Sequence, residues 1–234
     1  MRSARTIFFG SLVVMAVLFG IGANRYAALD EVVVSRAATQ EKIVAVTIDD
    51  GPHDKATPRM LEALRDTGIK ATFFILGKSA EEYPDLVRQV IADGHEIATH
   101  GYSHRNMARM SRAECEEEWE KAEHVLAEFG VQTDLFRPPG GAYGEVLVEG
   151  AKERGYHIIL WDVDPRDWQV PSDDTIVERI MAEVRPGSII LLHDGQYPIH
   201  SADALRKVAD RLKADGYSFV TVSEMMGMSA GGAE

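Results

Sequence analysis

Residues 43–52 read IVAVTIDDGP, an apolar and β-branched run that ends in two adjacent carboxylates, Asp49 and Asp50, followed by Gly-Pro. β-Branched residues favour strands, and the Asp-Gly-Pro sequence is typical of a turn. The run therefore predicts a strand whose polar residues gather at its carboxyl end. Because catalytic residues of α/β proteins collect where strands end and loops begin, this end is a candidate site.

Strand patterns alternate with helical patterns over the rest of the chain, often with a glycine at the helix-to-strand junction. This alternation predicts an α/β fold with a distorted parallel (β/α) barrel of about seven strands. Within one helix, Ser111 and Glu114 have the spacing of a capping box, and the acidic run 114–118 with Glu120 is interpreted as a solvated face. The strand-like stretches are residues 43–48, 71–76, 96–99, 157–161, 188–192 and 218–222, and the helical ones are residues 57–66, 84–92, 111–129, 145–154, 172–184 and 202–214.

The amino terminus predicts export. Arg2 and Arg5 precede an uncharged, mostly apolar run over residues 7–23, which would form an N-terminal hydrophobic helix. The run is close to the minimum length of a membrane span and longer than the apolar region of most cleaved signals. An uncleaved signal anchor is favoured over a cleaved signal peptide, and either would place the remaining chain outside the cytoplasmic membrane.

Four segments are expected on this basis. Residues 1–25 form the anchor or signal, 26–40 a linker or short ordered arm, 41–226 the catalytic domain and 227–234 a flexible tail. The net charge is −12, which argues against nucleic acid as a partner because phosphate binding needs clustered Lys and Arg. We expect a monomer that contacts the membrane through its N-terminal segment alone.

Two polar clusters at predicted strand ends suit a metal ion. Asp49 and Asp50 end the first strand, and HGYSH at residues 100–104 follows the strand that ends at Thr99. Two imidazoles four residues apart could lie on one side of a helical turn. With one carboxylate they form a two-His, one-Asp set that leaves a position open for water or substrate.

Three further clusters follow other predicted strands. FRPPGG at residues 136–141 contains a permanent cation at Arg137 and glycine N–H groups that could approach an oxyanion. The other two clusters are DPRDW at residues 164–168 and IILLHD at residues 189–194. The second contains His193, and a histidine near a carboxylate suits general acid catalysis.

Together the five clusters resemble, in order, the five motifs of the polysaccharide deacetylases, also called NodB homology domains or carbohydrate esterase family 4. The resemblance covers residues 43–222. It implies a distorted parallel barrel and hydrolysis of the N-acetyl group of N-acetylhexosamines in a cell-envelope polysaccharide, with peptidoglycan favoured.

The resemblance also implies a role for each matching residue. Asp50, His100 and His104 would bind one divalent metal, with Zn²⁺ favoured and Co²⁺, Mn²⁺ or Ni²⁺ as alternatives. Asp49 would be the general base that takes a proton from the attacking water, and Arg137 would orient it.

His193 would be the acid that protonates the leaving amine, with Asp167 tuning it. The backbone N–H near Gly140 would contact the oxyanion, and Trp168 and Leu191 would hold the acetyl methyl group.

Two positions depart from the family pattern. Gly101 stands where the second motif usually has Ser or Thr, a residue thought to steady the loop. Gly140 stands where the third motif often has Tyr, so Tyr143 could supply the sugar contact instead.

Three other functions remain open at this stage. An O-acetyl esterase of the same family would share the carbonyl chemistry. A catalytically silent carbohydrate-binding relative would be expected to lack a metal ligand or the base, and this chain keeps both. An unrelated phosphoesterase would often use two metals and more ligands than the three that cluster here.

Overall fold

Strand β2 (Ile43–Asp49) lies at the centre of the fold and is buried along its whole length, in a computed structural model that describes residues 32–231 and the side chains of 32–227. It pairs in parallel with β3 (Thr72–Ile75) on one side and β7 (Ser188–His193) on the other. The expectation that residues 43–48 form a strand of a parallel sheet is therefore confirmed.

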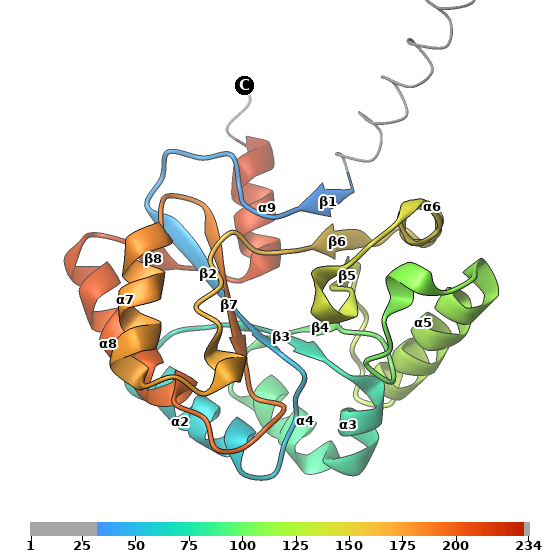
Figure 1. The fold of residues 1–234 in the computed structure, drawn as a ribbon, viewed down its shortest axis with the longest axis horizontal. Coiled ribbons are helices and arrows are strands. Elements are labelled where there is room, and N and C mark those ends of the chain that lie inside the picture. The colour runs from blue at the N-terminus through green and yellow to red at the C-terminus, as the bar shows by residue number, and fades with distance from the viewer. Residues whose placement is uncertain (1–31, 232–234) are drawn as a thin grey trace, which may run out of the picture.

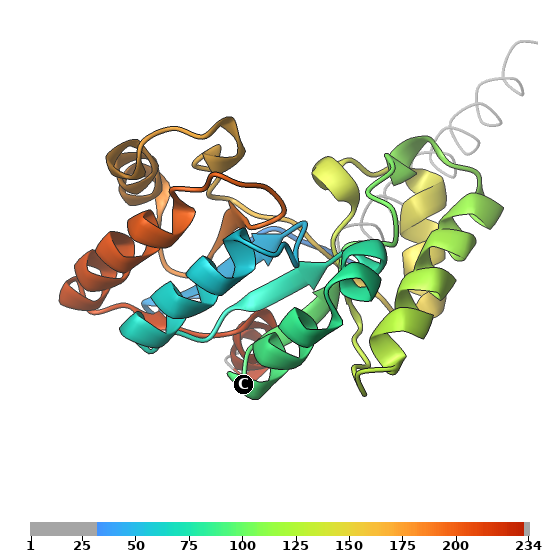
Figure 2. The same ribbon diagram turned by 90° about the horizontal axis from the view of Figure 1, so that it is seen from below.

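The sheet curls into a half-barrel whose strands follow the order β1-β6-β5-β4-β3-β2-β7, with β8 pairing with β2 beside this path. All the pairings between its strands are parallel, and helices lie on the outside of the curl, apart from the C-terminal helix, which packs against the inner core (Figures 1 and 2). This confirms the predicted distorted parallel barrel of about seven strands. The remaining strands and α-helices are β1 (Val33–Val34), α2 (Ala56–Thr67), α3 (Gly77–Glu82), α4 (Pro84–Ala92), β4 (Glu96–Thr99), α5 (Arg112–Ala127), β5 (Leu135–Phe136), α6 (Glu145–Arg154), β6 (His157–Ile159), α7 (Asp173–Glu183), α8 (Ser201–Ala214), β8 (Ser218–Phe219) and α9 (Val222–Gly231). Three 3₁₀ helices lie between them, η1 (Met107–Arg109), η2 (Pro139–Gly141) and η3 (Asp167–Gln169).

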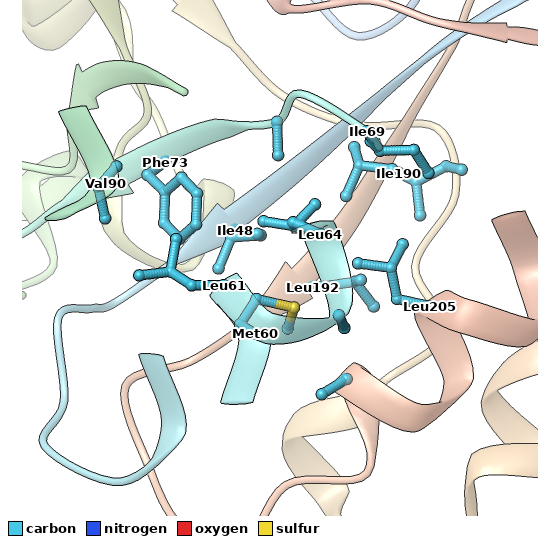
Figure 3. Packing of buried hydrophobic residues seen from close by; sticks show 14 of the residues in the cluster. Ile48, Met60, Leu61, Leu64, Ile69, Phe73, Val90, Ile190, Leu192 and Leu205 are labelled. Atoms are coloured by element: carbon cyan, nitrogen blue, oxygen red, sulfur yellow. The ribbon is translucent and has the colours of Figure 1, made fainter. Parts of the chain in front are cut away.

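Successive side chains of β2 point alternately to an outer core, between the sheet and the helices, and to an inner core inside the barrel. Val44, Val46 and Ile48 point outward and pack with residues of α2, α4 and α8. Figure 3 shows Met60, Leu61 and Leu64 of α2 lying beside Ile48 in this outer core. The intervening residues point into the barrel, because successive side chains of a strand face opposite sides. Asp49 ends this inner row.

The inner core is smaller and is covered at one end by α9. Ala45 of β2 and Phe74 of β3 cluster there with Val222 and Met225 of the helix. Apolar residues thus fill the amino-terminal end of the barrel, and polar residues occupy the carboxyl end.

The half-barrel is joined across its open side by single bridges. Val163, which follows β6, pairs with Ile190 of β7, and Arg36, which follows β1, pairs with Ser188. Asp162 accepts hydrogen bonds from the N–H of Ile189 and the hydroxyl of Ser188 at 2.9 and 3.1 Å. These contacts fix β7 against the segment that carries the fourth cluster.

Several boundaries differ from expectation. The range 26–40, expected as a linker or a short ordered arm, contains β1, which pairs with β6 and so belongs to the sheet. The predicted tail 227–234 begins inside α9, which continues to Gly231. Four strands and α-helices of the described chain were not predicted: β1, α3, the two-residue strand β5 and α9. The capping box at Ser111 is confirmed.

The predicted N-terminal hydrophobic helix and the signal or anchor at residues 1–25 lie outside the described residues. Among residues 32–231, no helix combines the length and apolarity that a membrane crossing requires.

Candidate active site

Strand register brings two of the predicted catalytic residues together. Asp49 at the end of β2 is the register partner of His193 at the end of β7. Both open into a cavity of about 370 Å³ at the carboxyl end of the barrel. The cavity is lined by Asp49, Asp50, His100, His104, Gly140, Trp161, Asp164, Trp168, Leu191 and His193.

Asp50, His100 and His104 form a group whose potential ligand atoms all lie within 4.8 Å of one another. The Oδ1 atom of Asp50 is 3.3 Å from Nε2 of His100 and 3.2 Å from Nε2 of His104. This oxygen is buried and has no hydrogen-bond partner in the described part of the protein. A buried carboxylate oxygen between two imidazole nitrogens is the arrangement that a bound divalent cation would satisfy.

The tautomer of His100 suits the same purpose. Its Nδ1 is 2.8 Å from the carbonyl oxygen of Arg137, and because a carbonyl can only accept, Nδ1 carries the proton. Nε2 therefore presents its lone pair toward Asp50. A hydrogen bond from the other ring nitrogen is the usual support of a metal-binding histidine. The three residues fit a zinc site with positions left open.

Electrostatics keep Asp50 in the form that a metal needs. Burial raises the pKa of Asp50, but the neighbouring imidazoles of His100 and His104 outweigh burial and hold the pKa below its ordinary value. The carboxyl group is thus an anion at neutral pH.

The backbone is left-handed at two of the three candidate ligands, with φ of 76° at Asp50 and 61° at His104. Residues other than glycine rarely adopt this conformation, and it is concentrated at functional sites. Gly195 makes room for Asp50, because a Cβ atom at residue 195 would lie 2.3 Å from the Cβ of Asp50. Residues 100–104 form no helix, and the backbone is left-handed at His104. A loop therefore connects the two histidines, and the predicted helical turn between them is wrong.

Arg137 holds one oxygen of Asp49 and leaves the other free. Its Nη1 donates to Oδ1 of Asp49 at 2.6 Å and to Oγ1 of Thr47 at 2.8 Å. Oδ2 of Asp49 lies on the other side, 3.8 Å from Nε2 of His100. Asp49 thus points a carboxylate oxygen toward the candidate metal ligands.

His193 is tied to Asp167 in a similar way. Its Nδ1 lies 2.7 Å from Oδ1 of Asp167, and its backbone N–H donates to Oδ2 at 2.8 Å. The hydroxyl of Ser201 also donates to Oδ2, at 2.6 Å. Nδ1 therefore carries a proton, and Nε2 is the nitrogen that remains for substrate.

The protonation of His193 yields a testable prediction. Burial lowers the pKa of His193, but the hydrogen bond and charge of Asp167, with Asp49 and Asp50, outweigh burial and raise it from 6.5 to about 9. In the metal-free protein we expect the imidazole to titrate near pH 9 and Asp167→Asn to lower that value. Because the folded pKa is raised, the stability that the pair contributes is fully present below pH 6.5 and is lost as pH rises through about 9.

NMR titration of the histidine ring protons would measure this, with His193→Gln to assign the resonance. Titration of His193 at or below the ordinary histidine value would contradict the prediction. A divalent cation bound nearby should lower the value again by charge repulsion.

The structure brings together most of the residues that the sequence nominated. Eight line the cavity, and Arg137 and Asp167 are buried behind Asp49 and His193. Tyr143 is the exception, since it is 46% exposed and is not part of the cavity wall. Gly140 lines the cavity with φ of 68°, a conformation that suits glycine.

Sequence reasoning missed several residues that shape the site. Trp161 lines the cavity, and its ring lies 5.4 Å from the guanidinium of Arg137. Asp194 is fully buried, which raises the pKa of its carboxyl group to about 7, and it accepts a hydrogen bond from Thr57 at 2.6 Å. Its position explains Gly51, where a Cβ would lie 2.2 Å from Oδ1 of Asp194.

The sequence is similar to a family model and to curated proteins that are all named as deacetylases. The family model for polysaccharide deacetylase matches residues 36–159. A peptidoglycan-N-acetylglucosamine deacetylase from Bacillus cereus is 39% identical over 189 residues, which cover 80% of this chain and 89% of that protein. A chitooligosaccharide deacetylase from Azorhizobium caulinodans is 36% identical over 200 residues, covering 79% of this chain and 94% of that protein.

A solved structure extends the comparison to three dimensions. The crystal structure of the Bc1960 peptidoglycan N-acetylglucosamine deacetylase superimposes with a TM-score of 0.82 and 35% sequence identity, covering 86% of this chain and 96% of that one. The sequence match, the shared fold and the order of the five clusters agree. The chain therefore belongs to the polysaccharide deacetylase family, hydrolases that act on carbon–nitrogen bonds other than peptide bonds.

Proposed function

We propose that this protein removes acetyl groups from N-acetylhexosamine residues of peptidoglycan, using one divalent metal with Zn²⁺ favoured over Co²⁺, Mn²⁺ or Ni²⁺. The observation that carries the proposal is the arrangement of one cavity. Asp50, His100 and His104 form one wall of it, and Asp49 and His193 face the same space.

Asp49 and His193 would carry out the two proton transfers of the reaction, and each is held in place by a neighbouring residue. Asp49, held at Oδ1 by Arg137, has Oδ2 free to take a proton from the attacking water. His193, held at Nδ1 by Asp167, has Nε2 free to give a proton to the leaving nitrogen. Attack of the water oxygen on the acetyl carbon would turn the carbonyl into a tetrahedral oxyanion while Asp49 takes the proton of the water. Its collapse would break the carbon–nitrogen bond as His193 protonates the nitrogen, so that acetate and a free amino sugar leave.

A divalent metal held by Asp50, His100 and His104 would supply a Lewis acid for the acetyl carbonyl and the attacking water. Gly140 lines the same cavity and is the proposed backbone donor to the oxyanion. Leu191 and Trp168 give the cavity apolar surface for the acetyl methyl group.

Peptidoglycan is proposed over short chitin oligomers because a peptidoglycan-N-acetylglucosamine deacetylase has the higher identity of the two enzyme types, 39% against 36%. The proposed location is outside the cytoplasmic membrane, with residues 1–25 as anchor or, alternatively, as a cleaved signal. Such a location would give access to the polymer.

The test is acetate release by the full-length chain in detergent. Purified protein is stripped of metal, then supplied with Zn²⁺ or kept in chelator, and offered peptidoglycan, chitooligosaccharides and acetylated xylan. We expect Zn²⁺-dependent acetate and new free amines from peptidoglycan, and none in chelator. Truncation at Gln40 is avoided because β1 would be lost from the sheet edge.

The other outcomes are equally informative. Acetate from xylan alone would establish an O-acetyl esterase. Faster release from chitooligosaccharides than from peptidoglycan would identify chitooligosaccharides, in place of peptidoglycan, as the preferred substrate. No release from any polymer, with Zn²⁺ bound, would indicate a silent carbohydrate-binding protein.

A further inference from the structure

Glu118 of α5 lies where the sequence places a solvated helix face, but its side chain is buried, with 6% of the residue exposed. Its carboxylate faces the loop that connects His100 to His104. Oε2 accepts the backbone N–H groups of Tyr102 at 3.1 Å and Ser103 at 2.9 Å. Oε1 accepts the hydroxyl of Ser103 at 2.6 Å. One carboxylate therefore binds three donors of this loop.

The same loop is also hydrogen-bonded by α3. The N–H of Gly77 donates to the carbonyl of Gly101 at 3.0 Å, and the N–H of Lys78 donates to the carbonyl of Tyr102 at 3.0 Å. The first turn of α3 thus satisfies loop carbonyls while Glu118 satisfies loop N–H groups. The segment is fixed between two helices that come from different parts of the chain.

The loop needs such support because its backbone is unusual. Gly101 has φ of 78° and His104 has φ of 61°, both left-handed. A non-glycine residue held in this region costs of order 1–3 kcal/mol and persists only when its surroundings determine it. His104 is half exposed at its side chain, so packing around its ring supplies little of that restraint.

A buried carboxylate is itself expensive unless it is compensated. Within residues 32–227, Glu118 forms no salt bridge with Lys, Arg or His, so hydrogen bonds from the loop are what compensate it. Helix α5 already has a capping box and a buried apolar face at Cys115, Trp119 and Ala122. The helix therefore does not require Glu118 to be buried, whereas the loop does require an acceptor.

We infer that Glu118 is a positioning residue that sets the spacing of His100 and His104 before a metal binds. The inference rests on the proposed function, because it assigns those histidines to a metal. Its consequence is that Glu118 contributes to metal affinity without touching the metal. Groups that hydrogen-bond the ligands of a metal typically change metal affinity or activity by 10- to 100-fold when mutated, and Glu118 acts on the loop that carries two such ligands.

The test measures Zn²⁺ binding to the metal-free, full-length protein by calorimetry or competition with a chromophoric chelator. Glu118→Gln keeps the size of the side chain but places an NH₂ group opposite loop donors. We expect its Zn²⁺ dissociation constant to rise about 10- to 100-fold. Saturating Zn²⁺ should restore much of the acetate release, with KM little changed.

Glu117→Gln is the matched control, because it removes the same charge from the neighbouring residue. The side chain of Glu117 is 62% exposed and pairs with Lys121. Its Zn²⁺ affinity should equal that of wild type. If Glu118→Gln does not fold, Ser103→Ala removes a single bond to Glu118 and should weaken Zn²⁺ binding by a smaller factor.

Two results would overturn the inference. Zn²⁺ affinity equal to wild type in a folded Glu118→Gln protein would leave Glu118 a purely structural residue, even if the melting temperature fell. Failure of the wild type to bind Zn²⁺ would remove both the site and its positioning residue. A wild type that binds Zn²⁺ but releases no acetate would contradict the proposed reaction alone, and the affinity comparison would still decide the role of Glu118.

Discussion

Replacing Asp49 with Asn is expected to lower the rate of acetate release by about 10²- to 10⁴-fold while leaving the protein folded and able to bind Zn²⁺. The amide oxygen of Asn can still accept the 2.6 Å hydrogen bond from Arg137, so the side chain keeps its place. The atom that changes chemically is Oδ2, which faces His100 and loses its ability to take a proton. The loss should appear in kcat at saturating metal and substrate.

Asp54→Asn is the matched control for this experiment. Asp54 is in the same strand-to-helix loop and 53% of its side chain is exposed, so its replacement should leave the rate near wild type. Zn²⁺ titration of both variants separates a lost base from a lost ligand. A variant at residue 49 that keeps most of the wild-type rate would assign the proton transfer to another group. Weak Zn²⁺ binding would instead place Asp49 among the ligands.

The position of Asp49 could be predicted because strand alternation leaves little choice. In IVAVTID, residues 44, 46 and 48 pack in the outer core, so the alternating position of Asp49 faces the barrel interior. The same reasoning applies to His193, which ends the buried run of β7. Parallel strands place their carboxyl ends at one edge, and the clusters therefore had to meet.

The loop between His100 and His104 could not be predicted in the same way. Spacing of four residues fits one turn of helix as well as a loop, and only the left-handed backbone at Gly101 and His104 distinguishes them. Glu118 was misinterpreted for a related reason. In the run ECEEEWE the buried glutamate has the same neighbours as the exposed ones, and its role depends on a loop 15 residues away.

Short elements were missed because they carry almost no pattern. β1 and β5 have two residues each, too few to show alternation, and their pairing depends on β6 between them. At the carboxyl end, the predicted strand at 218–222 is a two-residue strand followed by α9, whose Val222 and Met225 cover the inner core. Long-range packing decides these segments, and single-sequence propensity does not report it.

Arg137→Met is expected to lower the free energy of unfolding by about 3–5 kcal/mol and to abolish most acetate release. The guanidinium is completely buried and lies 4.0 Å from the ring centroid of Phe74. Beyond Thr47 and Asp49, it donates from Nε to the carbonyl of Ile159 and from Nη2 to that of Leu160, both at 2.9 Å. Methionine fills part of the volume but leaves a buried carboxylate at Asp49 without its countercharge.

Urea denaturation of the metal-free protein measures this loss, with Arg185→Met as control. Arg185 pairs with Asp162 but is 61% exposed, so its removal should cost less than about 1 kcal/mol. The double variant Asp49→Asn/Arg137→Met should lose less than the sum of the single changes, because it leaves no buried charge unpaired. Additive losses would mean that Arg137 supports the barrel through the carbonyls of β6 and its following residue. They would also mean that its pairing with Asp49 contributes little to the fold.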